Sequence, residues 1–369
     1  MDKFQNAAAF IEKVIKKREL EYFDISVFQK YQQIYRKTIK PETYGQRDKL
    51  YMYSCTKPLT AVCVMRLEEA GKISLTDRLT DYLPAFQNCW YRNEQGEKQI
   101  VGNEITLRHL MTMTAGLSYD LDTPAINALL ENGGQPTTIE MMNAIAQTPL
   151  LHRPGAQFTY SLCLDVMAAV VEIASGMRFA DYVAENVFKP LGMHDSHFED
   201  NDRERMIPVF EATAEGMRAR PLGNGMVRSP NFDSGGAGLI STVEDYAKFG
   251  TVLANGGTSA DGYVLLKPET IAQMTEEAVS IRDINSKFTC IQGDDYSYGL
   301  GVRTRIVDTP WGLTRGEFGW DGAAGSYLMV DPVKEICIVM GLHVMNWPMA
   351  FQGEHLAIVE EIYRAIEEA

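Results

Sequence analysis

Strand-like segments occur near both ends of this chain, while its long middle is patterned as helices. Residues 22–39 are rich in aromatic and β-branched residues with partial alternation, which predicts two strands. Residues 298–307, 326–332 and 335–344 predict three further strands, with a turn at 331–334 between the last two. Because strands must pair to satisfy their backbone groups, this distribution predicts one sheet built from both termini. The fold class is therefore expected to be α/β combined with an inserted all-α region.

Apolar residues at helical spacing account for much of the remaining chain. An opening helix is predicted at 7–18 and a closing helix at 354–369. Residues 57–71 predict a buried helix with Pro58 in its first turn and Gly71 at its C-terminal cap. Further helices are predicted at 106–116, 137–147, 162–176, 179–188 and 242–257.

Composition limits the function classes that need to be considered. The chain has 369 residues, 45% of them hydrophobic, so it can bury a full core. A formal net charge of −14 disfavours nucleic acid and anionic membrane surfaces as partners. No run approaches the roughly 18 apolar residues of a membrane span, and the N-terminus lacks a signal-peptide pattern, so a cytoplasmic location is expected. The expected partner is a small-molecule substrate, and the oligomeric state stays open.

Neither a metal nor a cofactor is expected. The six cysteines are scattered without C-x-x-C spacing, so we expect them to be reduced and mostly buried. His194 and His197 form an H-x-x-H pair that lacks further ligands, which favours a surface loop over a metal site. His109 lies in an apolar helical segment and is expected to be a core histidine. The sequence has no G-x-S-x-G elbow, H-E-x-x-H motif or glycine-rich phosphate loop, so competing hydrolase and nucleotide sites are disfavoured.

Ser54 precedes Lys57 by three residues at the entrance of the helix predicted at 57–71. The serine oxygen would lie at the positive end of the helix dipole, with the lysine one turn away on nearly the same face. A lysine can take the proton of a serine hydroxyl if burial or another cation makes it less basic, so the pair can form a nucleophile and its base. The alternative is structural, with Ser54 as a helix cap and Lys57 as a solvated residue.

Two further segments support the catalytic interpretation. Tyr160 stands just before the long apolar helix at 162–176, and Trp320 begins a W-D-G triplet that leads into the strand at 326–332. Taken alone, Tyr160 could be an aromatic residue at a helix entry and Trp320 a core residue. The three segments in this order make coincidence a poor explanation.

Ser54-Cys55-Thr56-Lys57, Tyr160-Ser161-Leu162 and Trp320-Asp321-Gly322 resemble the three motifs of class C β-lactamases, penicillin-binding DD-peptidases and family VIII carboxylesterases. The resemblance covers nearly the whole chain, because segments at 71–84, 105–117, 190–198 and 235–249 also match in order. It implies a β-lactamase/transpeptidase-like fold, in which an antiparallel sheet flanked by helices and an inserted helical region enclose the active-site groove.

The resemblance also implies roles for individual residues. Ser54 would be the acylated nucleophile and Lys57 its proton partner. Tyr160 would relay protons to the leaving group and later from the hydrolytic water. The oxyanion hole would be formed by the backbone N–H groups of Ser54 and Ala323.

Two departures from the lactamase pattern narrow the substrate. Leu162 replaces the asparagine of Y-x-N that helps to hold an acylamino group, and Trp320 replaces the lysine or histidine that faces a substrate carboxylate. Both changes exchange a polar anchor for an apolar surface and resemble the esterase branch. Leu162, Trp320, Asp321 and Gly322 are therefore expected to contact a substrate that lacks a recognised carboxylate.

The sequence thus predicts a serine hydrolase that cleaves short acyl esters through a Ser54 acyl-enzyme, with amides as a second candidate substrate class. The first alternative is a β-lactamase or D-amino-acid peptidase, for which Arg303 and Arg315 are candidate carboxylate anchors near the third motif. The second alternative is a non-catalytic binding or scaffold homologue, against which the retention of Ser54, Lys57 and Tyr160 argues.

The predicted division places 1–53 and 224–369 in an α/β region that holds the antiparallel sheet. Residues 54–223 form a mainly helical region that carries the serine, the lysine and the tyrosine. Stretches near 117–135 and 200–235 are expected to be loops, where substrate walls usually lie.

Overall fold

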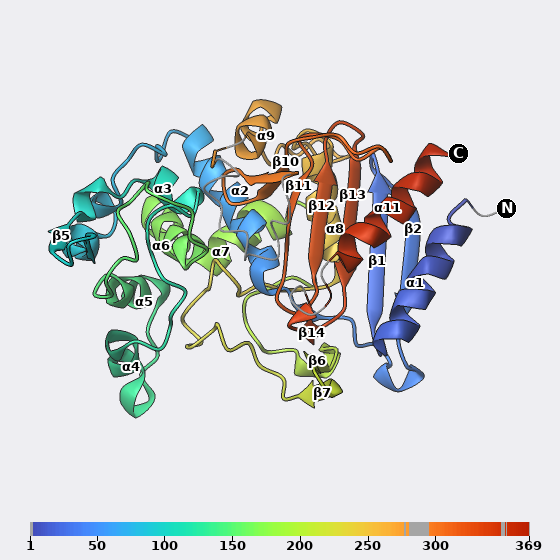
Figure 1. Ribbon diagram of the computed structural model, residues 1–369, viewed down its shortest axis with the longest axis horizontal. Helices are drawn as coiled ribbons and strands as arrows, with labels where there is room; N and C mark the ends of the chain where they lie inside the picture. The colour runs from blue at the N-terminus through green and yellow to red at the C-terminus, as the bar shows by residue number, and fades with distance from the viewer. Residues whose placement is uncertain (1–2, 277, 280–294, 348–350, 352, 369) are drawn as a thin grey trace.

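Strands from both ends of the chain form one antiparallel sheet in the computed structural model, which describes residues 3–276, 278–279, 295–347, 351 and 353–368 (Figure 1). The central pairing joins the two termini, because Asp24 lies opposite Gly341 and Gln29 opposite Ile336. In spatial order the strands are β2 (Gln32–Ile39), β1 (Phe23–Gln29), β13 (Ile336–Gly341), β12 (Tyr327–Asp331), β11 (Phe318–Asp321), β10 (Arg303–Arg305) and β9 (Tyr296–Tyr298). The predicted sheet is confirmed.

Helices cover both faces of this sheet, and the pleat decides which side chains they meet. On β13, Ile336 and Ile338 belong to the apolar cluster that includes α1 (Gln5–Arg18) and α11 (Glu354–Glu367). The alternate residues, Cys337 and Val339, belong to the cluster that includes α8 (Val243–Ala254) on the opposite face. Figure 1 shows both termini on the sheet side of the molecule, and the predicted opening and closing helices are present as α1 and α11.

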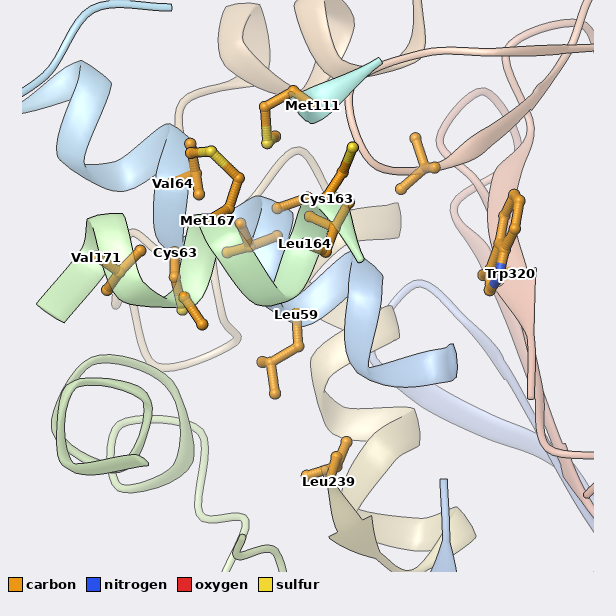
Figure 2. Packing of buried hydrophobic residues seen from close by; sticks show 14 of the residues in the cluster. Leu59, Cys63, Val64, Met111, Cys163, Leu164, Met167, Val171, Leu239 and Trp320 are labelled. Carbon is orange, nitrogen blue, oxygen red and sulfur yellow. The ribbon is translucent and has the colours of Figure 1, made fainter. Parts of the chain in front are cut away.

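The helical region packs around two helices that carry motif residues or adjoin them. They are α2 (Thr56–Glu69), whose side chains are almost all buried, and α6 (Cys163–Ser175). Figure 2 shows Cys63 of α2 near Met167 and Val171 of α6, Leu59 of α2 pointing toward Leu239, and Trp320 set apart on β11. The other described helices are α3 (Leu107–Met111), α4 (Pro124–Leu130), α5 (Thr138–Ile145), α7 (Phe179–Val183) and α9 (Pro268–Thr275).

Two predicted elements are wrong in extent. The single strand expected at 298–307 is a hairpin of β9 and β10, in which Gly299 N–H donates to Val302 O at 2.9 Å and Gly301 takes a φ of 76°. The helix expected at 106–116 ends at Met111, because Met113 has a left-handed φ of 56°. The pattern of apolar residues continues through both breaks, so this pattern alone does not predict them.

The two predicted loops also contain regular structure. The first holds α4, whose N-cap Thr123 accepts a hydrogen bond from the Ile126 N–H. The second holds the hairpin of β6 (Val209–Thr213) and β7 (Gly216–Arg220), and β14 (Val344–Met345) pairs in parallel with β6. This pairing ties the second loop to the C-terminal part of the chain. The domain boundary at residue 224 stays a prediction.

The predictions for the cysteines and for His109 have different outcomes. Cysteines 55, 63, 89, 163 and 337 are buried free thiols, as predicted, and Cys290 lies outside the described residues. His109 is only half-buried and accepts the Thr106 N–H at the start of α3, so it is a capping residue instead of a core histidine. Across the part of the chain that the structure describes, every helix is too short or too polar to cross a membrane.

Candidate active site

Ser54 lies at a strained turn between a short strand and helix α2. Strand β3 (Leu50–Tyr51) pairs with β8 (Ile240–Ser241), and Tyr53 then takes a left-handed φ of 45°. Such a conformation costs a non-glycine residue on the order of 1–3 kcal/mol and is concentrated at functional sites. Ser54 follows in a 3₁₀ turn with only 9% of its surface exposed.

The alternative of Ser54 as a helix cap is not supported. The residue at the N-cap of α2 is Cys55, and no side chain caps this helix by a hydrogen bond. The Ser54 hydroxyl is engaged elsewhere, since its Oγ lies 3.1 Å from Lys57 Nζ. Burial raises the pKa of the Cys55 thiol to about 12, so the neighbouring sulfur stays protonated and is not a competing nucleophile.

Lys57 is completely buried instead of solvated. Its ammonium donates to Ser54 Oγ, to the Gly236 carbonyl oxygen at 2.8 Å and to the Tyr119 hydroxyl at 3.3 Å. It also lies 4.6 Å from the centre of the Tyr160 ring. These contacts hold the nitrogen at one position beside the serine oxygen.

Tyr160 approaches the serine from the other side. Its hydroxyl donates to Ser54 Oγ at 2.7 Å, across 106 residues of sequence. The ring is stacked between Tyr119, at 5.2 Å and 11°, and Trp320, at 5.5 Å and 19°. The Trp320 indole Nε1–H points at the Tyr160 hydroxyl oxygen, 3.3 Å away. The structure therefore brings residues of the first, second and third motifs together around the Tyr160 hydroxyl oxygen.

Tyr119 is a site residue that the sequence reasoning missed. It lies in the stretch 117–135, which was expected only to form a substrate wall. A lone tyrosine in a loop has no periodicity to mark it. The only feature of the sequence that could have indicated Tyr119 was its position just after segment 105–117, which resembles the family.

The third motif is held by a buried charge cluster behind it. The Asp321 carboxylate accepts from Arg303 at 3.0 Å and lies 2.8 Å from His355 Nδ1 of α11. Arg303 also donates to Glu317 at 2.9 Å, and both side chains are almost completely buried. Asp321 therefore contacts Arg303 and His355 instead of facing a substrate. Arg303 is committed to these pairs and is not free to anchor a carboxylate.

The candidate oxyanion segment is fixed against the serine segment. Ser326 Oγ donates to the Met52 carbonyl at 2.7 Å, and Gly322 N–H donates to Ser326 O at 2.7 Å. A Cβ on Gly322 would lie 2.0 Å from Ser326 Oγ, so only glycine fits there. Ala323 follows, half-buried, and its N–H donates no hydrogen bond to any described residue. An available donor of this kind is what an oxyanion hole requires.

Leu162 does not lie where the sequence suggested. Its side chain is completely buried in the helical core at the N-cap of α6, so it offers a substrate no surface. Trp320 is also completely buried, and it reaches the site through its contact with Tyr160. Arg315 lines a separate surface hollow of about 630 Å³ with Glu276 and Arg305.

Neither histidine of the H-x-x-H pair is placed to bind a metal. His194 is exposed, and His197 Nε2 lies 3.1 Å from the Lys49 ammonium, which would repel a cation. Within the described residues there is no group of three or more His, Cys, Asp or Glu side chains suited to a metal ion.

The sheet, the inserted helices and the Ser–Lys–Tyr cluster define a serine hydrolase of the β-lactamase/transpeptidase type. A family model described as Beta-lactamase matches residues 25–361, and the chain belongs to this family.

Known proteins of this type are similar along most of the chain. Esterase EstB from Burkholderia gladioli is 29% identical over 317 residues, which cover 78% of this chain and 75% of the esterase. Monacolin J acid methylbutanoyltransferase from Aspergillus terreus is 26% identical over 321 residues, covering 80% and 76%. The solved structure of EstCE1, a hydrolase with promiscuous acyltransferase activity, superposes with a TM-score of 0.77 at 22% identity, covering 99% and 98%. The predicted family and fold are confirmed.

Proposed function

We propose that this chain hydrolyses short, neutral acyl esters through an acyl-enzyme on Ser54. The observation that carries the proposal is the position of Ser54 Oγ between Lys57 Nζ, at 3.1 Å, and the Tyr160 hydroxyl, at 2.7 Å. A serine hydroxyl becomes a useful nucleophile when neighbouring groups take its proton. Two such groups are within hydrogen-bonding distance here.

In the proposed reaction, the Lys57–Tyr160 pair first loses one proton to solvent, and Ser54 Oγ then attacks the ester carbonyl carbon while its own proton passes to the pair. The N–H groups of Ser54 and Ala323 stabilise the oxygen of the tetrahedral intermediate. When the C–O bond to the alcohol breaks, Tyr160 returns the proton to the leaving oxygen. The same pair then takes a proton from the water that attacks the acyl carbon, and it returns that proton to Ser54 Oγ as the bond between the acyl carbon and the serine oxygen breaks and the acid is released.

The surroundings of the third motif favour a neutral substrate over a carboxylated β-lactam. A charge-assisted hydrogen bond to a carboxylate contributes about 1.5–3 kcal/mol, or roughly 10- to 100-fold in affinity. Trp320 is uncharged and fully buried, its indole N–H points at the Tyr160 hydroxyl, and Arg303 behind it is paired with Glu317 and Asp321. The similarity to an esterase supports the same choice. The cytoplasmic location stays a prediction.

A panel of substrates tests this proposal. We expect kcat/KM for a neutral short-chain aryl ester to exceed that for a penicillin by at least about 100-fold. Covalent labelling by a fluorophosphonate should be stoichiometric and confined to Ser54. Efficient penicillin turnover would instead favour the β-lactamase alternative, and folded protein that resists labelling would favour the scaffold alternative.

Acyl transfer to an alcohol is a second candidate outcome of the same acyl-enzyme. Ser54 is only 9% exposed and Lys57 is fully buried, which limits the access of water to the intermediate. The similarity to a methylbutanoyltransferase supports this possibility. Adding a short alcohol to the ester assay should divert product from acid to new ester. An unchanged acid yield at high alcohol concentration would exclude it.

A further inference from the structure

Asp165 is a buried carboxylate that the proposed mechanism does not use. It is the third residue of α6 and only 1% exposed. Its Oδ1 accepts from Ser234 Oγ at 2.5 Å and from the Gly236 N–H at 3.1 Å. Its Oδ2 is buried and has no hydrogen-bond partner among the described residues. A charged carboxylate in this position is costly unless a cation lies nearby.

Lys57 provides that cation on the other side of one short turn. The Gly236 carbonyl accepts from Lys57 Nζ at 2.8 Å, while the N–H of the same residue donates to Asp165. Thr60, one turn along α2, donates to the Gly235 carbonyl at 2.6 Å. The turn is therefore held from both sides, by α2 through Lys57 and Thr60 and by α6 through Asp165.

The backbone of Gly236 packs directly against the Asp165 carboxylate, with no space for a side chain at position 236. A Cβ on Gly236 would lie 2.3 Å from Asp165 Oδ2, so the backbone itself meets the side chain. Burial raises the pKa of the Asp165 carboxyl, and the charge of Lys57 acts in the opposite direction. The two groups therefore influence each other across the turn.

The other titratable groups that face Lys57 in the described residues are phenols and thiols. Tyr119 and Tyr160 face it from the loops that precede α4 and α6. The thiols of Cys55 and Cys163 lie close to it, and burial raises the pKa of each to about 12. Among the described residues, Asp165 is thus an acidic group that packs behind the lysine.

We propose that Asp165 is a positioning residue for Lys57, which holds the Ser234–Gly236 turn against α2 and balances the buried ammonium charge. The inference rests on the proposed function, because Asp165 acts on the reaction only through Lys57. Removing the carboxylate charge weakens the electrostatic hold on the Lys57 proton. A limb of the pH–rate profile that reports the protonation of Lys57 then shifts to lower pH. The direction of the shift is the same whether the reaction needs the neutral amine or the ammonium.

The test compares Asp165→Asn with Asp245→Asn. The asparagine at 165 keeps one acceptor oxygen for Ser234 and Gly236, removes the charge and replaces the other oxygen by an NH2 group of similar size. Asp245 is an equally buried carboxylate, 3% exposed, which accepts from the Asp195 N–H and lies outside the site. The readout is the rate of Ser54 labelling by a fluorophosphonate between pH 5 and 10, with circular dichroism to confirm folding.

We expect Asp165→Asn to move the labelling profile by about one unit to lower pH, the lower end for the loss of a nearby opposite charge. Asp245→Asn should leave the profile in place. Ser234→Ala removes one donor to the carboxylate, so it should cause a smaller shift in the same direction, and it decides the question if Asp165→Asn does not fold.

An unshifted profile for folded Asp165→Asn would overturn the proposal. A uniform loss of labelling at every pH would also overturn it, since that result indicates packing alone. If the wild-type protein is not labelled at Ser54, the proposed function fails instead, so the two failures are distinguishable.

Discussion

Replacing Trp320 by phenylalanine removes a polar contact that the third motif makes with Tyr160. The indole Nε1–H donates to the Tyr160 hydroxyl oxygen at 3.3 Å, while the ring stacks on the tyrosine at 5.5 Å. Phenylalanine keeps an aromatic ring and removes the donor. The donor matters most when Tyr160 carries negative charge, because it then stabilises the phenolate that receives the serine proton.

The expected size of the effect follows from the length of this hydrogen bond. A hydrogen bond to a charged group contributes about 1.5–3 kcal/mol, and 3.3 Å is slightly longer than the usual N–H···O range. We therefore take a value just below this range, about 1.4 kcal/mol, which corresponds to one pH unit or a factor of ten. In Trp320→Phe, the rising limb of kcat/KM should move about one unit to higher pH, and activity at pH 7 should fall about tenfold.

The assay is the pH dependence of kcat/KM for a neutral aryl ester, measured on wild type, Trp320→Phe and the control Trp90→Phe. Trp90 lies on β4 (Trp90–Arg92), where its ring is partly exposed under Lys98. The control should match wild type. A folded Trp320→Phe protein whose profile superimposes on that of wild type would refute the reasoning, and so would an equal loss of activity at every pH.

Three further predictions concern other parts of the structure. Tyr119→Phe removes the hydroxyl bonded to Lys57 but keeps the stack on Tyr160, so kcat should fall about 3- to 10-fold; unchanged kcat would contradict this contact. Arg303→Met leaves two buried carboxylates without their cation, so it should lower the free energy of unfolding by about 3–5 kcal/mol. Denaturant unfolding measures this change, and an unchanged unfolding midpoint would contradict it. Burial lowers the pKa of His343 from 6.5 to about 4, so the unfolded chain binds a proton that the folded chain refuses. Stability should therefore fall by about 3 kcal/mol from this group between pH 6.5 and 4, and His343→Gln should flatten that slope in urea titrations.

The sequence was most informative where local periodicity and motif order agreed. The helix that carries Lys57 has a register that places Ser54 one turn away, and the observed 3.1 Å contact confirms that neighbourhood. The strands at the two termini were predicted because their composition is strongly β-forming, and β1 does pair with β13. Tyr160 lies 106 residues from Ser54, so only its motif context could suggest that the two side chains meet.

Other features depend on packing that no local pattern records. Leu162 is aligned with a substrate-binding position of the lactamases, yet it turns into the helical core at the N-cap of α6. Asp321 was expected to face the substrate, but Arg303 and His355 from distant segments hold it on the opposite side. Tyr119 enters the site only because its loop folds over Lys57. Each outcome depends on contacts between residues far apart in the chain.

The central claim is that Ser54 forms a covalent acyl intermediate during ester turnover. The most direct measurement is mass spectrometry of the intact protein, quenched with acid during hydrolysis of a slowly deacylated aryl ester, for wild type and Ser54→Ala. We predict a mass increase of one acyl group on the wild type, located by peptide mapping to Ser54, and no adduct on the variant. Burst release of the phenol should accompany it. A Ser54→Ala protein that keeps wild-type esterase activity, or an adduct mapped to another residue, would contradict this account.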